Sequence, residues 1–338
     1  MEKNFDIISF GEMMLRLSPP GKQRFSRSGS FEKQAGGSEL NIAAGVAALG
    51  LNTAIISRMP VHDVSQFIMN EIRALGVADD YIIYDKNPDT RLGIYYYESG
   101  ASPRKPSIIY DRKGSAINRI KFDEIPPEAY GSTRLFHTSG ITLALGEATR
   151  SAAQNMMKRF KEAGAILSFD VNYRANLWSE DEARRTIEKV LPLLDILFIS
   201  EETTRKMFRK TGELHDIMKS YCSDYGIPVV ATTERKVIGA SQHSFSSTIY
   251  SSKDDRFYNE HAYEKIEVVD RIGSGDAYVA GVLFGMLKYT DLQKALEFGN
   301  AMAAVKSTIP GDLIVTSFGE IERIIKAHQG EQQSEMNR

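Results

Sequence analysis

Residues 268–284 contain the groups best suited to chemistry. Gly273, Ser274 and Gly275 lead into a proline-free segment rich in Ala, Val and Leu, a pattern typical of a buried helix that is apolar on nearly all sides. The first N–H groups of such a helix lack intrahelical acceptors, and glycine lets a ligand approach the backbone, so this turn suits an anion. Asp276 stands in the same turn. A carboxylate that can take a proton beside a bound phosphate is the minimal apparatus for moving a phosphoryl group to a hydroxyl.

Other interpretations of this segment are open to the sequence. Asp276 is also explained as a favourable charge at a helix N-terminus, worth ~0.3–1 kcal/mol. A dinucleotide-binding fingerprint fits less well, because its third glycine is replaced by Tyr278 and the motif lies late in the chain. The sequence contains no GxxxxGK[ST], which excludes a P-loop.

The composition is that of a globular protein with one large or two modest domains. Of the 338 residues, 42% are hydrophobic and 25% charged, and 42 basic against 44 acidic residues give a net charge of -2. This balance gives no sign of a nucleic-acid or membrane surface. The only cysteine is Cys222, which excludes an intramolecular disulfide and a cysteine-based zinc site. With no signal peptide and no apolar run near ~20 residues, we expect a cytoplasmic protein.

Short β-branched segments alternate with longer helical patterns, which predicts an α/β fold with a mostly parallel sheet covered by helices on both faces. The expected strands cover residues 7–10, 53–57, 135–139, 165–170, 196–200 and 228–232. The expected helices include residues 38–49, 149–163 and 180–191.

Two segments interrupt the alternation. Residues 13–35 and 90–115 contain scattered aromatic residues and Gly/Pro turns, and we expect them to pair as a small antiparallel flap. Such a flap suits a lid or a contact between subunits. We therefore predict a single α/β domain over residues 1–328 with these lid segments, followed by a loose polar tail at 329–338.

The chain resembles the ribokinase-like (PfkB) sugar kinases, and most closely their 2-keto-3-deoxygluconate kinases. The likeness covers nearly the whole chain, and its motifs occur in the family's order: Gly11-Glu12, Gly36-Gly37-Ser38-Glu39-Leu40-Asn41, Arg91-Leu92-Gly93-Ile94-Tyr95, Ile108-Ile109-Tyr110-Asp111-Arg112, Asp170-Val171-Asn172-Tyr173-Arg174 and Gly273-Ser274-Gly275-Asp276. The fold implied by the family is a central α/β sheet with a β-lid.

The resemblance also implies roles for particular residues. Asp276 matches the catalytic base, and Gly273, Ser274 and Gly275 match the anion hole that faces the transferring phosphate. The positions that match sugar-binding residues are Gly37, Asn41, Tyr95, Tyr110, Arg112, Arg174 and, less directly, Asp312. Asn172 and Asn300 match nucleotide contacts, and the implied cofactors are ATP and Mg²⁺.

The residue types agree with these roles but do not require them. Asn41, on the first turn of its helix, offers donors and acceptors to hydroxyl groups, although it is equally explained as a solvated residue beside a Ser38 cap. Arg174 follows a strand, at the end of a parallel sheet where ligands gather. Guanidinium pairs with a carboxylate at two points, so Arg174 together with Arg112 favours an acidic sugar over ribose or fructose. Tyr95 has the alternative of simple packing on a strand face.

Three segments depart from the family's pattern. Where the family carries Asn-x-x-Glu near the metal, this chain has Ser200-Glu201-Glu202-Thr203, so Glu201 or Glu202 is the substitute metal residue. The loop expected near the nucleotide lacks its glycine and reads Thr233-Glu234-Arg235-Lys236-Val237-Ile238. Arg271 replaces a frequent Thr.

These observations predict an ATP-dependent kinase acting on the terminal hydroxyl of 2-keto-3-deoxygluconate. A kinase of the same fold for a neutral or related deoxy-keto sugar, a non-catalytic sugar-binding regulator and, more distantly, a dehydrogenase are the alternatives. The expected partners are a small acidic sugar and a second copy of the chain, bound through the β-lid, with no nucleic acid and no membrane.

Overall fold

The short β-branched segments form one large mixed sheet in the computed structural model, which describes residues 3–239 and 241–330. Its strands are β1 (Phe5–Phe10), β4 (Thr53–Pro60), β5 (Val77–Ala78), β6 (Ile82–Asp85), β9 (Thr133–Ser139), β10 (Ile166–Asp170), β11 (Ile196–Phe198), β12 (Val229–Gly239), β13 (Gln242–Ser251), β14 (Arg256–Tyr258) and β15 (Tyr263–Glu267). They are ordered β14-β13-β12-β11-β10-β9-β1-β4-β5, with β15 paired with β13 and β6 with β4. The pairings from β4 to β12 are parallel, and those of β13 are antiparallel.

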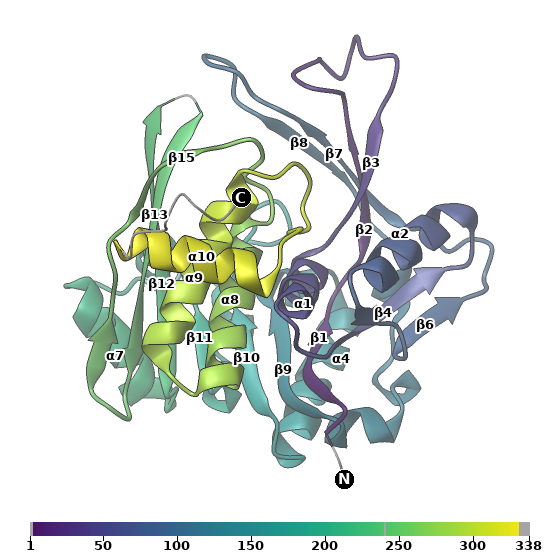
Figure 1. Ribbon diagram of the computed structural model, residues 1–338. Helices are drawn as coiled ribbons and strands as arrows, with labels where there is room; N and C mark the ends of the chain where they lie inside the picture. Colours follow the sequence, from purple (N-terminus) through teal and green to yellow (C-terminus); the bar gives the residue numbers. More distant parts are fainter. Residues whose placement is uncertain (1–2, 240, 331–338) are drawn as a thin grey trace.

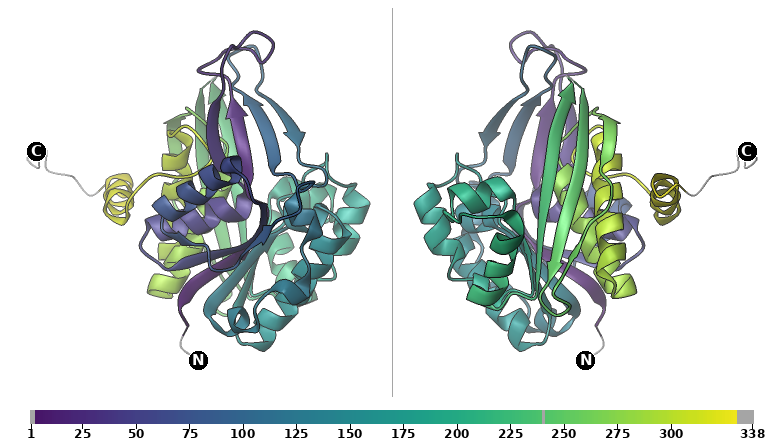
Figure 2. Two further views of the ribbon diagram at one scale, coloured as in Figure 1. Left: turned by 90° about the vertical axis from the view of Figure 1, so that its right-hand side faces the viewer. Right: turned by 90° about the vertical axis from the view of Figure 1, so that its left-hand side faces the viewer.

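Helices cover both faces of this sheet (Figures 1 and 2). The α-helices are α1 (Ser38–Ala48), α2 (Asp63–Ala74), α3 (Gly140–Ala144), α4 (Glu147–Glu162), α5 (Glu180–Ile187), α6 (Glu201–Lys206), α7 (Leu214–Tyr225), α8 (Ser274–Tyr289), α9 (Leu292–Ser307) and α10 (Phe318–His328). Short 3-10 helices cover Ala116–Arg119, Phe122–Glu124, Pro127–Gly131 and Leu191–Leu193. One hydrophobic cluster joins α1, α8, α9 and α10 to the sheet, and another joins α4, α5 and α7 to its opposite face.

A second, smaller sheet projects from the main one, at the upper right of Figure 1. It contains β2 (Met14–Ser18), β3 (Glu32–Gly36), β7 (Gly93–Glu98) and β8 (Ser107–Asp111), in the order β3-β2-β7-β8. β2 pairs antiparallel with β3, and β7 with β8, but β2 and β7 run parallel. The expectation of a purely antiparallel flap was therefore wrong. Two hairpins leave the main sheet side by side, and their inner strands point the same way.

The predicted architecture is confirmed: a mostly parallel sheet lies between two helical layers and carries a small lid sheet. The expected helix over residues 180–191 ends earlier, at Ile187, and a 3-10 turn containing Pro192 follows, because proline cannot donate the next helical hydrogen bond. The segment expected to be a nucleotide loop is instead the outer half of β12. Most of the predicted tail, residues 331–338, lies outside the described residues. Within residues 3–239 and 241–330, no helix has the length and apolar character needed to span a membrane.

Candidate active site

The N-termini of α1 and α8 meet at the carboxyl ends of the parallel strands. The residue before α8, Gly273, has a φ of 81°, and a Cβ there would lie 2.1 Å from the backbone oxygen of Asp312. Gly37, before α1, has a φ of 140°, and its Cβ would lie 2.2 Å from the backbone oxygen of Glu12. Both turns therefore require glycine, both for the backbone angle and for the space. They bring Asp276 of α8 beside the first turn of α1.

The carboxylate of Asp276 is held by neutral donors. Ser38 Oγ donates to Asp276 Oδ1 at 2.7 Å, and Asn41 Nδ2 donates to Oδ2 at 2.7 Å. Asn172 Nδ2 in turn donates to Ser38 Oγ at 3.0 Å. Burial raises the pKa of Asp276 above its ordinary value, and the bonds from Asn41 and Ser38 partly oppose that shift. No lysine or arginine within the described chain forms an ion pair with this carboxylate, so it is suited to accept a proton.

Ser38 was not predicted as a site residue. The sequence allowed it to be a helix cap, but Gly37 occupies the cap position and Ser38 is the first residue of α1. Its hydroxyl is therefore free to link Asn172 to Asp276. The serine directly after two glycines at a helix start was the signal that could have identified it.

Three backbone N–H groups beside Asp276 are open. Those of Gly273, Gly275 and Asp276 have no acceptor among the residues that the structure describes, whereas the N–H of Ser274 donates to Arg271 O at 3.3 Å in a turn. A Cβ placed on Gly275 would meet no atom within 4 Å, and Gly275 lines a cleft. An anion can therefore approach this end of α8.

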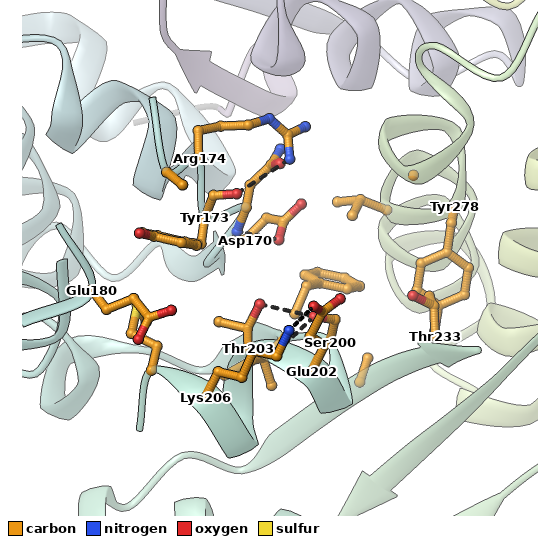
Figure 3. A pocket seen from close by; sticks show the side chains of 18 residues that line it. Asp170, Tyr173, Arg174, Glu180, Ser200, Glu202, Thr203, Lys206, Thr233 and Tyr278 are labelled. Atoms are coloured by element: carbon orange, nitrogen blue, oxygen red, sulfur yellow. Dashed lines mark hydrogen bonds and ion pairs between the residues drawn. The ribbon is translucent and has the colours of Figure 1, made fainter. Parts of the chain in front are cut away.

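The cleft in front of these amides has a volume of about 510 Å³ (Figure 3). It lies at the carboxyl ends of β10, β11 and β12, the place where open α/β sheets bind ligands. Asp170 lines it, and burial together with the charge of Asp276 raises the pKa of Asp170 to about 7. A second acid so close to Asp276 favours a cation or a proton in this part of the cleft.

Arg174 and Asn172 both line this cleft. Arg174 is exposed, extends above Asp170 in Figure 3 and donates only to the backbone oxygen of Tyr173, at 3.4 Å. Its charge lowers the pKa of Asp170 and Asp276, opposing their burial. Within the described residues its guanidinium has no acidic partner, so it is available to a carboxylate of a ligand.

The lid residues contact the turn before α8 through a buried polar cluster. Tyr95 OH donates to Asp312 Oδ2, and Arg16 Nη1 of β2 donates to Asp312 Oδ1 at 2.8 Å. Arg16 Nη2 also pairs with Asp270 Oδ2 at 2.5 Å. Tyr110 lies against Tyr95 with ring centroids 5.6 Å apart, and it is 36% exposed. The lid sheet is thereby joined to the loop that carries the open amides.

Arg112 occupies a different environment from Arg174. Its guanidinium is buried and pairs with Glu12, the distance from Nε to Oε2 being 2.7 Å, and Ser115 Oγ donates to the same carboxylate. Arg112 therefore already has a carboxylate partner. Its predicted contact with the sugar would require that pair to open.

The structure does not place two other groups of predicted residues around Asp276. Asn300 is fully buried, with Nδ2 donating to Glu260 Oε1 at 2.6 Å and Oδ1 accepting from Ser247 at 2.7 Å, and it does not line the cleft. Glu201 and Glu202 pair with Arg205 and Lys206 on α6, and only Glu202 lines the cleft. The described residues contain no cluster of three or more metal-ligating side chains.

Comparison with known proteins decides the family. Residues 4–314 match the model of the pfkB family carbohydrate kinases. The chain belongs to this family. It is 32% identical over 321 residues to the 2-dehydro-3-deoxygalactonokinase of Haloferax volcanii, covering 95% of this chain and 96% of that protein. It is 30% identical to the 5-dehydro-2-deoxygluconokinase of Clostridium beijerinckii, over 90% of this chain and 87% of the relative.

The chain also has the fold of a solved kinase structure. The crystal structure of 2-dehydro-3-deoxygluconokinase from Thermotoga maritima superposes with a TM-score of 0.90 and 34% identity, covering 95% of this chain and 99% of that one. This pfkB protein is therefore a carbohydrate kinase, close to the kinases of dehydro-deoxy sugars.

Proposed function

We propose that this kinase transfers the γ-phosphoryl group of ATP to the terminal hydroxyl of 2-keto-3-deoxygluconate. The observation that supports this most is the carboxylate of Asp276, which forms no ion pair with a described residue and is held by Ser38 and Asn41 beside the open amides. The names of the relatives from Haloferax volcanii and Thermotoga maritima support the substrate class.

The proposed step uses the residues in a definite order. As the sugar oxygen attacks the γ-phosphorus, Asp276 accepts the hydroxyl proton, the new O–P bond forms and the bond to the β-phosphate oxygen breaks, leaving ADP. The N–H groups of Gly273, Gly275 and Asp276 stabilise the negative charge on the phosphoryl oxygens. Ser38 and Asn41 hold the carboxylate in one orientation, so the proton acceptor is already in place.

Asn41 has a further feature that suits a sugar. Its Nδ2 is used by Asp276, while its Oδ1 is buried and has no partner among the described residues. A buried acceptor without a partner costs roughly 1–3 kcal/mol. A sugar hydroxyl that donated to this oxygen would remove the cost, so we infer that Asn41 contacts the substrate hydroxyls.

Mg²⁺ fits the acidic part of the cleft. Asp170 and Glu202 both line it, and burial together with the negative charge of Asp276 raises the pKa of Asp170. A magnesium ion usually retains several waters and binds one or two carboxylates together with substrate phosphates, so no larger protein cluster is needed. We propose that Asp170 would hold the ion together with Glu202, whose pair with Lys206 would have to open. The ion would neutralise the charge of the nucleotide phosphates when bound.

The acidic substrate is tested by replacing Arg174. A coupled assay would measure phosphorylation of 2-keto-3-deoxygluconate, its galactonate epimer, ribose and fructose by the wild type and by Arg174→Leu. We expect activity on the keto-deoxy acids and a rise in their KM of roughly ten-fold or more in the variant, from loss of a charged hydrogen bond.

The matched control is Arg185→Leu, which removes an exposed arginine on the neighbouring helix α5 and should leave KM within about two-fold. If the enzyme phosphorylates ribose or fructose and Arg174→Leu does not change that activity, the substrate is a neutral sugar instead. Absence of phosphorylation of all four sugars would reject the proposal.

We also propose that two copies associate through the lid. The edge strand β8 is exposed along its whole length and presents Ile108 and Ile109, and Phe31 beside β3 is 42% exposed. An exposed apolar edge strand is a surface that proteins usually cover. Light scattering of Ile109→Lys should then show a smaller particle than the wild type. An unchanged monomeric mass in both proteins would reject this contact.

A further inference from the structure

Two arginines without an assigned role lie at the first turn of α8. Arg235 Nη2 donates to Ser274 Oγ at 2.7 Å. The same hydroxyl donates to the backbone oxygen of Arg271 at 2.9 Å. Ser274 therefore connects the two arginines, and it stands between Gly273 and Gly275, whose N–H groups are open.

The strand geometry places Arg235 on the face of β12 that borders the cleft, next to the residues that line it. β12 continues to Gly239 and pairs with β13, with Arg235 opposite Phe245. Because side chains alternate along a strand, Arg235 shares a face with Thr233, and Thr233 lines the cleft. A loop at this place, as the sequence suggested, would not fix the direction of the side chain.

Neither guanidinium is neutralised within residues 3–239 and 241–330. Every ion pair of the described chain involves other residues, and the side chain of Arg271 makes no hydrogen bond to a described residue. Arg235 is exposed at the surface, but desolvation by the surrounding protein and the nearby charge of Arg271 lower the pKa of its guanidinium, so the two positive charges oppose each other. Two close cations beside open amides are stabilised when an anion binds between them.

We propose that Arg235 and Arg271 bind the terminal phosphoryl group of the nucleoside triphosphate. They would contact it from the side of the anion hole on which Ser274 lies. Guanidinium offers paired N–H groups to phosphate oxygens, and the bond to Ser274 Oγ holds Arg235 in position before the ligand arrives. This inference rests on the proposed kinase function. It also gives a role to two places where the chain departs from its family's pattern, since each supplies one of the guanidinium groups.

The test is a comparison of two nucleotides that differ in the terminal phosphate. Isothermal titration calorimetry in Mg²⁺ would measure ADP and the non-hydrolysable ATP analogue AMP-PNP with the wild type, Arg235→Gln, Arg271→Gln and the double variant. We expect each single substitution to weaken AMP-PNP binding roughly ten-fold, the usual effect of losing a charged hydrogen bond, with ADP binding within about two-fold of wild type. Arg256→Gln, at the exposed edge strand β14, is the control and should change neither affinity.

The outcomes separate this inference from the assignment of the sugar. A wild type that prefers AMP-PNP, and loses the preference in the variants, supports the arginine pair even if the sugar assay identifies another substrate. Equal weakening of ADP and AMP-PNP, unchanged binding of both, or a change in sugar KM alone would overturn it. A wild type that binds neither nucleotide would reject the proposed kinase reaction and the arginine pair together.

Discussion

Removal of Arg16 should destabilise the protein more than any surface substitution. Its guanidinium, 3% exposed, pairs with Asp312 at 2.8 Å and Asp270 at 2.5 Å and lies 4.3 Å above the ring of Tyr97. Arg16→Met keeps an apolar chain of similar length but leaves two buried carboxylates without their shared cation. Removing one partner of a buried ion pair typically costs ~3–5 kcal/mol, and we expect a loss in that range.

The pH dependence of this loss identifies its cause. Burial already raises the pKa of Asp312, and without Arg16 it should rise further. A carboxyl whose pKa is raised by folding binds protons more tightly in the folded state, so its stabilising contribution is present at low pH and is lost as pH rises. The deficit of Arg16→Met should therefore be largest near pH 8 and smaller near pH 5. Adding Asp312→Asn should recover part of it at pH 8.

Urea unfolding followed by the fluorescence of Trp178, the only tryptophan and a core residue, measures these free energies. Arg73→Met is the control, because Arg73 pairs with Asp79 at the surface with its side chain 50% exposed, and it should cost less than ~1 kcal/mol. A loss below ~1 kcal/mol for Arg16→Met, or a deficit that grows toward pH 5, would refute the reasoning.

Three further substitutions have defined outcomes. Asp170→Asn should raise the free energy of unfolding at pH 8 by up to about 4 kcal/mol and change it little at pH 4, because folding raises the pKa of this carboxyl to about 7. Equal free energies of unfolding for the wild type and the variant at pH 8 would contradict this. Gly273→Ala should cost roughly 2 kcal/mol or more by thermal unfolding, whereas Gly275→Ala, whose Cβ meets no atom within 4 Å, should fold normally. Ser38→Ala removes a donor to Asp276 and should move the acid limb of the kcat/KM profile to higher pH by about one unit, so an unmoved limb would show that the limb reports another group.

The fold could be predicted because local pattern and global architecture agree. Alternating β-branched and helical segments specify a parallel sheet between helices, and the all-round apolar composition of residues 277–285 placed α8 in the core. The pairing of strands could not be predicted in the same way. Period-two alternation shows which residues share a face of a strand, but it does not show which strand lies next to it. The parallel pairing of β2 with β7 was therefore missed.

The predicted residues that the structure brings together belong to short motifs, whereas the sequence does not reveal contacts between residues far apart in the chain. The glycine turns and Asp276 are local features. Arg112 is paired with Glu12, 100 residues away, and no local pattern reveals that partner. Arg16 carried a usable signal, because a single arginine inside the apolar run Met14-Leu15-Arg16-Leu17 must be buried with a partner.

The central claim is that Asp276 accepts the proton of the sugar hydroxyl, and one comparison tests it most directly. Turnover of ATP and 2-keto-3-deoxygluconate would be measured for the wild type and Asp276→Asn, with AMP-PNP binding as the check that the nucleotide site is intact. The account predicts a fall in kcat on the order of 10²–10⁴-fold with nucleotide binding preserved, as expected when a general base is removed. A variant that binds AMP-PNP normally and turns over within about ten-fold of wild type would contradict it.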